Sequence, residues 1–228
     1  MNMPNLDARL LSAAKFVREG SYVCDVGTDH AYLPVYLVLI GRSVRALASD
    51  INKGPVMRAK ESVDKYGVSD KIEVALGDGL TGADKYPITD IVIAGMGGEL
   101  ISSILDAAKW IQNEKYRLIL QPMTHAEILR EYLINNGFSI IDEDIVTEQK
   151  DRKIYQIICA EYSGKNDRYT TDELYLGRHN ISRRSSEFIK LCERLKKTNL
   201  EIKKAKESAG QSAALENEIA EIAERYLH

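Results

Sequence analysis

The sequence has few of the features that place a protein in a membrane or outside the cell. Its 228 residues contain no apolar run near the ~18 residues that span a bilayer. The first residues, MNMPNLDARLL, lack the basic-then-apolar pattern of a secretion signal. Cys24, Cys159 and Cys192 lie too far apart for a disulfide framework or a metal pair, and the four histidines show no metal-ligand spacing. We therefore expect a cytoplasmic protein with no membrane contact and no metal site.

Length and charge predict one domain of ordinary size with a smaller addition. At about 150 residues per domain the chain corresponds to between one and two domains, and 44% hydrophobic residues suffice for a sizeable core. The formal net charge of −3 is unevenly distributed. Residues 164–208 hold 12 of the 31 basic and 7 of the 34 acidic residues, a net charge of +5, which leaves −8 elsewhere. Such a basic segment suits a phosphate backbone, and a solvated helix face is an equally good interpretation.

The first two-thirds of the chain alternates strand-like and helix-like segments. Short β-branched or aliphatic runs bounded by Gly, Asp or Pro predict strands at 22–26, 44–49, 72–76, 88–94 and 117–121. Helical patterns lie at 32–40, 55–66, 99–108 and 125–135, and Gly137 is a predicted left-handed cap of the last one. This βαβα order predicts a parallel sheet with helices on both faces.

The alternation of strands and helices stops after the helix predicted at 125–135. The extended runs 139–149 and 153–162, joined by Lys150-Asp151-Arg152, predict an antiparallel hairpin at the end of the sheet. Five parallel strands and a hairpin make the strand count of a Rossmann-like class I methyltransferase. Beyond a linker at 163–167 the chain is helical, with apolar stripes that predict two antiparallel helices reversing at 208–212. The stripes comprise Phe188, Leu191, Leu195, Ile202 and Ala205, then Leu215, Ile219, Ile222 and Leu227. We expect a domain at 1–163 and a helical coiled-coil domain at 164–228.

The most informative motif follows the first predicted strand. A strand ends in Asp25-Val26-Gly27, and a short turn leads into a helix, which is where nucleotide cofactors bind in open α/β sheets. The dinucleotide fingerprint needs three glycines, but only Gly27 is present and Asp29 would face the pyrophosphate. S-adenosyl-L-methionine (SAM) has no phosphate and carries an ammonium group that a carboxylate can hold. The motif therefore favours SAM.

The next four predicted strands also end in polar or glycine-rich clusters. Asp50 lies 23 residues after Gly27, at the position of a ribose-binding carboxylate. Asp78 follows the third strand and suits an adenine amino group. The glycines at 95, 97 and 98 leave space for a bulky ligand, and Gln121 ends the fifth strand. The co-occurrence of these clusters is more specific than any one of them.

Five segments of the sequence resemble the bacterial tRNA (adenine-N1)-methyltransferase TrmK family. They are LDARL at 6–10, DVGTDHAYLP at 25–34, AGMGG at 94–98, LQP at 120–122 and NGF at 136–138. The resemblance implies SAM-dependent methylation of N1 of adenine 22 in tRNA. It also implies a class I methyltransferase domain followed by a helical coiled-coil domain that docks tRNA.

The strand-end motifs, the basic segment and the resemblance together suggest roles for residues of this chain. Arg9 would pair with the methionine carboxylate of SAM. The expected SAM-binding residues are Arg9, Asp25, Gly27, Thr28, His30, Asp50, Ile51, Asn52, Asp78, Gly79, Gly95, Met96 and Gly97. The expected catalytic residues are Asp29, Tyr32 and Gln121. Asp29 would accept from the exocyclic amine of the target base or cap the next helix, Tyr32 would stack on the base, and Gln121 would read the base edge. His30 could hydrogen-bond either SAM or the base. The expected tRNA-binding residues are Arg183, Arg184, Lys190, Lys196, Lys197, Lys203 and Lys204.

Two other functions remain open from the sequence. One is a SAM-dependent methyltransferase of another substrate, such as a protein or a metabolite. The other is a non-catalytic RNA-binding protein on a methyltransferase fold, against which the run of strand-end carboxylates argues. We expect a monomer in solution.

Overall fold

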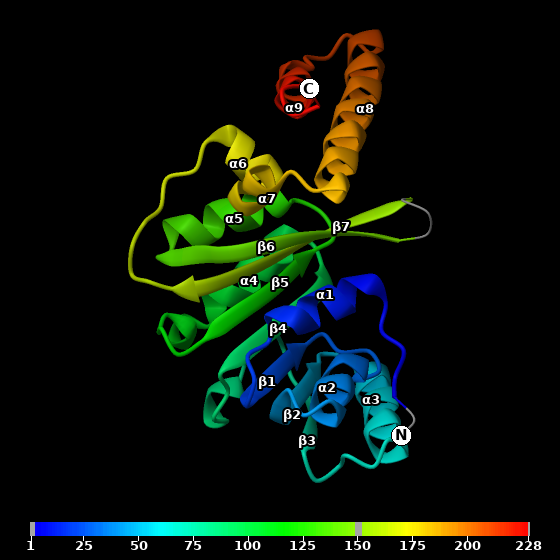
Figure 1. Ribbon diagram of the computed structural model, residues 1–228, viewed down its shortest axis with the longest axis vertical. Helices are drawn as coiled ribbons and strands as arrows, with labels where there is room; N and C mark the ends of the chain where they lie inside the picture. Colours follow the sequence, from blue (N-terminus) through cyan, green and yellow to red (C-terminus); the bar gives the residue numbers. More distant parts are fainter. Residues whose placement is uncertain (1–2, 149–151, 228) are drawn as a thin grey trace.

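The centre of the molecule is a seven-stranded sheet (Figure 1). Its strands are β1 (Ser21–Val26), β2 (Ser43–Asp50), β3 (Ile72–Leu76), β4 (Asp90–Met96), β5 (Arg117–Pro122), β6 (Phe138–Glu148) and β7 (Lys153–Tyr162). The computed structural model describes residues 3–148 and 152–227. The strand order is β3-β2-β1-β4-β5-β7-β6, with β1 to β5 parallel and β7 antiparallel to both β5 and β6. This confirms the predicted sheet and hairpin, although Lys150 and Asp151 of the predicted turn lie outside the described residues.

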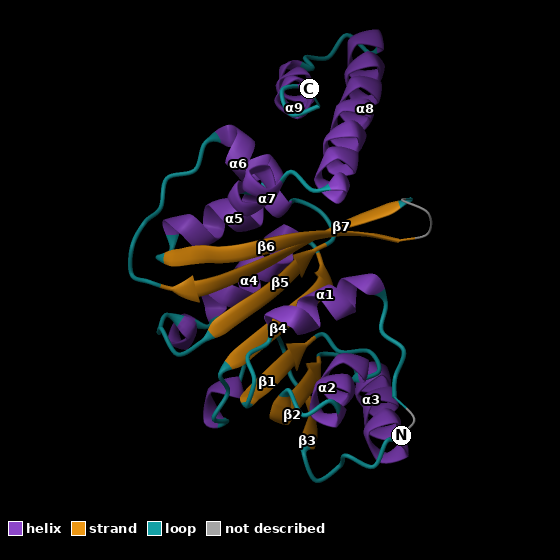
Figure 2. Ribbon diagram, viewed as in Figure 1, coloured by secondary structure: helices purple, strands orange, loops and turns teal. Residues whose placement is uncertain are grey.

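Helices cover both faces of this sheet (Figure 2). They are α1 (Ala8–Phe16), α2 (Tyr32–Leu39), α3 (Lys53–Lys65), α4 (Gly98–Ala107) and α5 (Ala126–Asn135), with short 3₁₀ turns at Ala83–Lys85 and Lys109–Ile111. The first three pack on one face, and α4 and α5 pack on the other. Gly137 ends α5 with a φ of +79°, which confirms the predicted cap.

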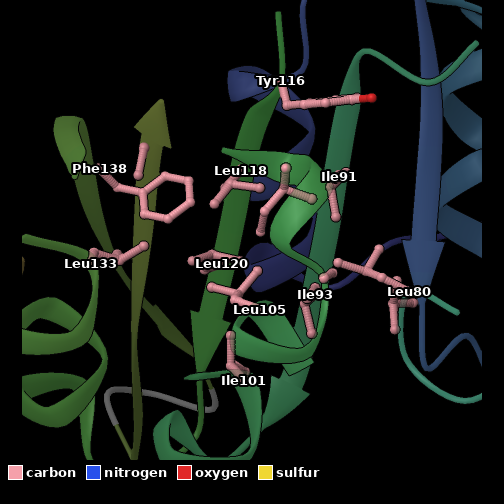
Figure 3. Close-up of a cluster of buried hydrophobic side chains, with 14 of the residues drawn as sticks. Leu80, Ile91, Ile93, Ile101, Leu105, Tyr116, Leu118, Leu120, Leu133 and Phe138 are labelled. Carbon is pink, nitrogen blue, oxygen red and sulfur yellow. The ribbon is translucent and has the colours of Figure 1, made fainter. Parts of the chain in front are cut away.

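The strands read as continuous apolar runs because both of their faces are buried. Ile91 and Ile93 of β4 point into the cluster beneath α4 and α5, whereas Val92 points into the cluster beneath α1 to α3. Figure 3 shows the first cluster, in which Leu105 of α4 and Leu133 of α5 meet the strands. All three cysteines are buried and unpaired.

The C-terminal part begins with two short helices that pack on the sheet domain. Its helices are α6 (Thr171–Leu176), α7 (Arg178–Arg183), α8 (Ser186–Ser208) and α9 (Ala214–Glu224). A reciprocal capping box between Thr170 and Glu173 begins α6, and the Ser185 side chain accepts from Phe188 N–H at the start of α8. α6 packs on α5, and α7 packs on β6. The domain boundary at 163/164 stays a prediction, since these two helices lie against the sheet domain.

The last two helices form the predicted antiparallel hairpin, but its apolar contacts are concentrated at one end. Phe188, Leu191 and Ile222 are buried where the hairpin meets β6. At the far end Ile202 and Leu215 are 40% and 53% exposed, so the predicted stripe is not buried along its whole length. At that far end Lys206 pairs with Glu216 at 2.5 Å, whereas the Lys196–Glu224 pair lies beside the buried end of the hairpin. In the described ranges, no helix is both long and apolar enough to cross a membrane.

Candidate active site

The carboxyl ends of the central strands bring the first motif together at the point where the strand order reverses. β1 has β2 on one side and β4 on the other, and crevices at such reversals bind ligands in open α/β sheets. A cleft of about 230 Å³ lies here. Its lining comprises Arg9, Leu10, Asp25, Gly27, Thr28, Asp29, His30, Tyr32, Leu33 and Ala94.

Gly27 shapes the floor of this cleft. Its φ is +76°, and its N–H donates to Ser49 O at 2.8 Å, which fixes the turn against β2. A Cβ added here would stand 2.1 Å from Met96 Cε, so only glycine lets the Met96 side chain lie over the turn.

Asp25 places a buried carboxylate in the cleft. The residue is only 7% exposed, and burial raises its pKa to about 6, while the Thr28 hydroxyl and the charge of Arg9 oppose the rise. The Thr28 hydroxyl also accepts from Ala31 N–H at 3.0 Å, at the start of α2. A buried carboxylate of this kind gains stability when a cation binds beside it.

Arg9 reaches the cleft from α1 and is held by Gln121. Arg9 Nη1 donates to Gln121 Oε1 at 2.9 Å, and the same oxygen accepts from Gly95 N–H at 3.0 Å. Gln121 Nε2 donates to Pro122 O at 2.8 Å, and the whole residue is buried. The side-chain amide of Gln121 is therefore engaged at both ends, and this geometry does not fit the predicted reading of a base edge.

Asp29, His30 and Tyr32 form the rim of the cleft. Asp29 accepts from Arg58 Nε at 2.9 Å and also from Arg58 Nη2. His30 Nε2 lies 3.4 Å from the other Asp29 oxygen, and the His30 and Tyr32 rings stack at 5.0 Å. The N-cap of α2 is Ala31, with no side-chain cap bond, so the capping alternative for Asp29 is wrong.

The other strand ends continue along the same edge. Asp50 Oδ1 accepts from Asn52 N–H at 2.7 Å at the end of β2, beside the exposed Ile51. Asp78 and Gly79 follow β3 and line a second cleft, of about 440 Å³, against α4. Gly97 is the N-cap of α4. No group of three or more His, Cys, Asp or Glu able to hold a metal occurs in the part of the chain that the structure describes.

Comparison with known proteins gives the family. The family described as a methyltransferase domain matches residues 6–158. A tRNA (adenine(22)-N(1))-methyltransferase of Bacillus subtilis is 41% identical over 177 residues, which cover 78% of this chain and 74% of that protein. The chain belongs to the TrmK family of tRNA (adenine-N1)-methyltransferases.

Two solved structures agree with this assignment over the whole chain. The B. subtilis m1A22 tRNA methyltransferase TrmK superposes with a TM-score of 0.86 at 33% identity, covering 98% of this chain and 99% of that one. A Streptococcus pneumoniae protein in complex with SAM also gives 0.86, at 31% identity, covering 98% and 100%. The TrmK family membership therefore extends to the C-terminal helices, where the sequence motifs are weakest.

Several of the predicted tRNA-binding residues make contacts within this TrmK-family chain. Arg183 pairs with Asp142, and Arg184 Nη2 donates to Tyr226 O at 2.8 Å. Lys196 pairs with Glu224, and Lys203 Nζ donates to Asn217 Oδ1 at 2.5 Å. Lys190 is half-buried, while Lys197 and Lys204 are exposed, and among the described residues neither of these two ammonium groups has an ion-pair or hydrogen-bond partner.

One residue that contacts the rim was missed by sequence reasoning. Arg58 lies on α3, and its guanidinium contacts Asp29. A single arginine on an amphipathic helix is typical of a solvated surface, so no sequence signal marks it.

Proposed function

We infer that the protein transfers the methyl group of SAM to N1 of adenine 22 in tRNA. The observation that carries this is the cleft at the strand-order reversal, where Arg9, Asp25 and Gly27 meet the rim residues in a chain 41% identical to an enzyme of that name. We propose that it acts in the cytoplasm, as a monomer.

The donor groups along the edge fit SAM in one orientation. Arg9 suits the methionine carboxylate, and the buried Asp25 suits the ammonium group. Both residues line the cleft at the ends of β1 and β4. Asp50 after β2 suits the ribose hydroxyls, and Asp78 after β3 suits the adenine amino group. Ile51, Asn52, Thr28 and Gly79 flank these groups, and Gly95 and Gly97 keep the β4 end open. We propose that Gln121 acts by holding Arg9 and Gly95.

The chemistry requires alignment more than proton abstraction. When bound, SAM would supply an electrophilic methyl group attached to a positively charged sulfur, and this sulfur is a good leaving group. N1 of adenine has a free lone pair at neutral pH, so Tyr32 and His30 need only hold the base in line and exclude water. The adenine gains positive charge as the N1–carbon bond forms and the carbon–sulfur bond breaks. Asp29 would stabilise that charge by accepting a hydrogen bond from the exocyclic amine.

The Asp25 pKa gives SAM binding a predicted pH dependence. The ionised carboxylate is the form that holds the ammonium, so binding requires loss of a proton below the pKa of about 6. We expect SAM affinity to be constant above pH 7 and to fall about tenfold for each pH unit below about 6. Calorimetry from pH 4.5 to 8 measures this. Asp25→Asn should bind SAM weakly with no such slope, and an equal slope in that variant contradicts the assignment.

The position of α8 supports a tRNA-docking role. β6 is parallel to β5, so the β6–β7 hairpin extends from the sheet edge at which the cleft lies. Figure 1 shows the hairpin projecting beyond the end of β5. The last β5–β7 pair is Leu120 with Ile158, and β7 begins five residues earlier, about 17 Å further out. Arg194 of α8 donates to Arg152 O beside the turn. A tRNA lying on α8 would therefore pass in front of the cleft.

The two faces of α8 predict different responses to loss of charge. Lys197 and Lys204 are exposed, whereas Lys196 and Lys206 pair with glutamates of α9. We expect Lys197→Gln/Lys204→Gln to weaken tRNA binding about tenfold at 0.1 M salt and to lower the salt slope by one to two. The matched Lys196→Gln/Lys206→Gln protein should keep the slope and lose thermal stability. Filter binding between 50 and 300 mM salt measures the tRNA affinity and the salt slope of both variants. Equal slopes in the two variants would contradict a tRNA contact on α8.

The experiment that tests the proposed function is mass mapping of tRNA after incubation with the protein and SAM. Methylation at N1 of adenine 22 is the expected result. Modification of a protein or metabolite instead of tRNA supports the other methyltransferase interpretation. Binding of tRNA without binding of SAM supports a non-catalytic RNA-binding protein.

A further inference from the structure

A continuous set of contacts leads from α3 to the rim of the cleft. Arg58 directs two nitrogens, Nε and Nη2, at a single oxygen of Asp29, Oδ1. The second oxygen, Oδ2, faces His30 Nε2 at 3.4 Å. The His30 ring in turn stacks on Tyr32, with 16° between the ring planes. Arg58 itself does not line the cleft.

This arrangement matters because Asp29 is not held by burial. Its side chain is 59% exposed and follows a short turn, so without a partner it would sample several rotamers. Arg58 engages only one carboxylate oxygen, and the other, which faces His30, keeps a lone pair that can accept a hydrogen bond from the substrate. A reacting group that is fixed in advance avoids the entropy cost of ordering it when the substrate arrives.

We propose that Arg58 is a positioning residue for the methyl-transfer step, which orients Asp29, and through it the His30–Tyr32 pair, toward the target adenine. The proposal rests on the proposed function, since it assigns Asp29 to the exocyclic amine of that base. Arg58 would act on turnover rather than on the affinity for SAM, because its guanidinium contacts Asp29, which is assigned to the target base and not to the cofactor.

Two other roles would give different results. An arginine that contacts a tRNA phosphate contributes to the affinity for tRNA. It also contributes about one to the slope of the logarithm of the binding constant against the logarithm of the salt concentration. An ion pair that only stabilises the fold contributes to thermal stability and little else, and exposed pairs contribute little even there.

The test compares Arg58→Gln, Arg58→Lys and Lys60→Gln. Lys60 is exposed on the same helix, two residues along, and lines a different part of the surface. We expect Arg58→Gln to lower kcat tenfold or more at saturating SAM and tRNA, with SAM and tRNA dissociation constants within twofold of wild type. Arg58→Lys should recover only part of kcat, because a lysine is a point charge and not a fork. Added guanidinium should raise kcat of Arg58→Gln and leave Lys60→Gln unchanged.

The outcomes separate this proposal from the proposed function. In an Asp29→Asn background the Arg58→Gln change should have no further effect on kcat, since each substitution alone already removes the ion pair between Arg58 and Asp29. Unchanged kcat with weaker tRNA binding and a smaller salt slope overturns the proposal in favour of a phosphate contact. If Arg58→Gln loses both thermal stability and SAM binding, the proposal is overturned in favour of a structural role. A wild-type protein that methylates no tRNA refutes the proposed function itself, before any variant is compared.

Discussion

Replacing Gly27 with valine is expected to weaken SAM binding at least a hundredfold. The new side chain would be placed at a φ of +76°, which β-branched residues avoid, and its Cβ would lie 2.1 Å from Met96 Cε. Gly27 N–H and Thr28 N–H both donate to Ser49 O, so the turn has no freedom to retreat. Met96 would have to move, and the new side chain would stand at Gly27, which lines the cleft. Gly27→Ala should give a smaller loss, of about tenfold, in calorimetry with SAM.

Gly41 provides a matched control for backbone strain. Its φ is +73°, close to that of Gly27, but nothing lies within 4 Å of an added Cβ. Gly41→Val should therefore lower the melting temperature and leave SAM affinity unchanged. If Gly27→Val bound SAM as tightly as Gly41→Val, the cofactor would not lie over this turn, and the assignment of Arg9 and Asp25 would fail with it.

The sequence predicted the parallel part of the sheet because its signals are local. Each of β1 to β5 is a short apolar run with a helix before the next run, and that order admits few topologies. The place of β7 was not predictable in the same way. A hairpin specifies that β6 and β7 pair, but not which of them meets β5. The packing of α6 and α7 on α5 and β6 was also missed, since it depends on distant polar contacts.

The site was predictable as far as it follows from strand ends. Asp25, Gly27 and the rim residues lie together because they belong to one stretch that runs from the end of β1 to the start of α2. Ala94 joins them because the parallel strands β1 and β4 end at the same edge, which the order of strands and helices implies. Side-chain direction was not available from sequence. Gln121 points at Arg9 instead of a base, and Arg58 was indistinguishable from a surface arginine. A charge count likewise did not separate Lys196, which pairs with α9, from Lys197, which does not.

A buried ion pair anchors the C-terminal helices to the sheet domain. Arg130 of α5 and Glu143 of β6 are both fully buried, with Nε and Oε1 2.7 Å apart. Arg130 also donates to Leu174 O at 2.7 Å in α6, and Glu143 Oε2 accepts from His179 N–H at 3.0 Å in α7. The pair thus satisfies backbone groups of both short helices as well as each other.

Arg130→Met should lower the free energy of unfolding by about 3–5 kcal/mol, because it leaves the Glu143 carboxylate buried without its cation. Arg130→Met/Glu143→Gln should recover much of this loss, since the glutamine removes the charge and keeps an oxygen for His179 N–H. Arg117→Met, in the half-buried Arg117–Glu161 pair, should cost at most about 1 kcal/mol. Urea denaturation measures all three proteins.

The same variants test whether this anchor serves tRNA docking. Loss of the Arg130 contacts to α6 should loosen the helices that carry α8, so tRNA affinity should fall in Arg130→Met while SAM affinity stays near wild type. The double variant should regain stability but not full tRNA affinity, because Leu174 O still lacks its donor. Equal tRNA affinity in wild type and both variants would mean that α8 keeps its position without the anchor, held by the packing of Phe188 and Leu191 beside Ile145 of β6.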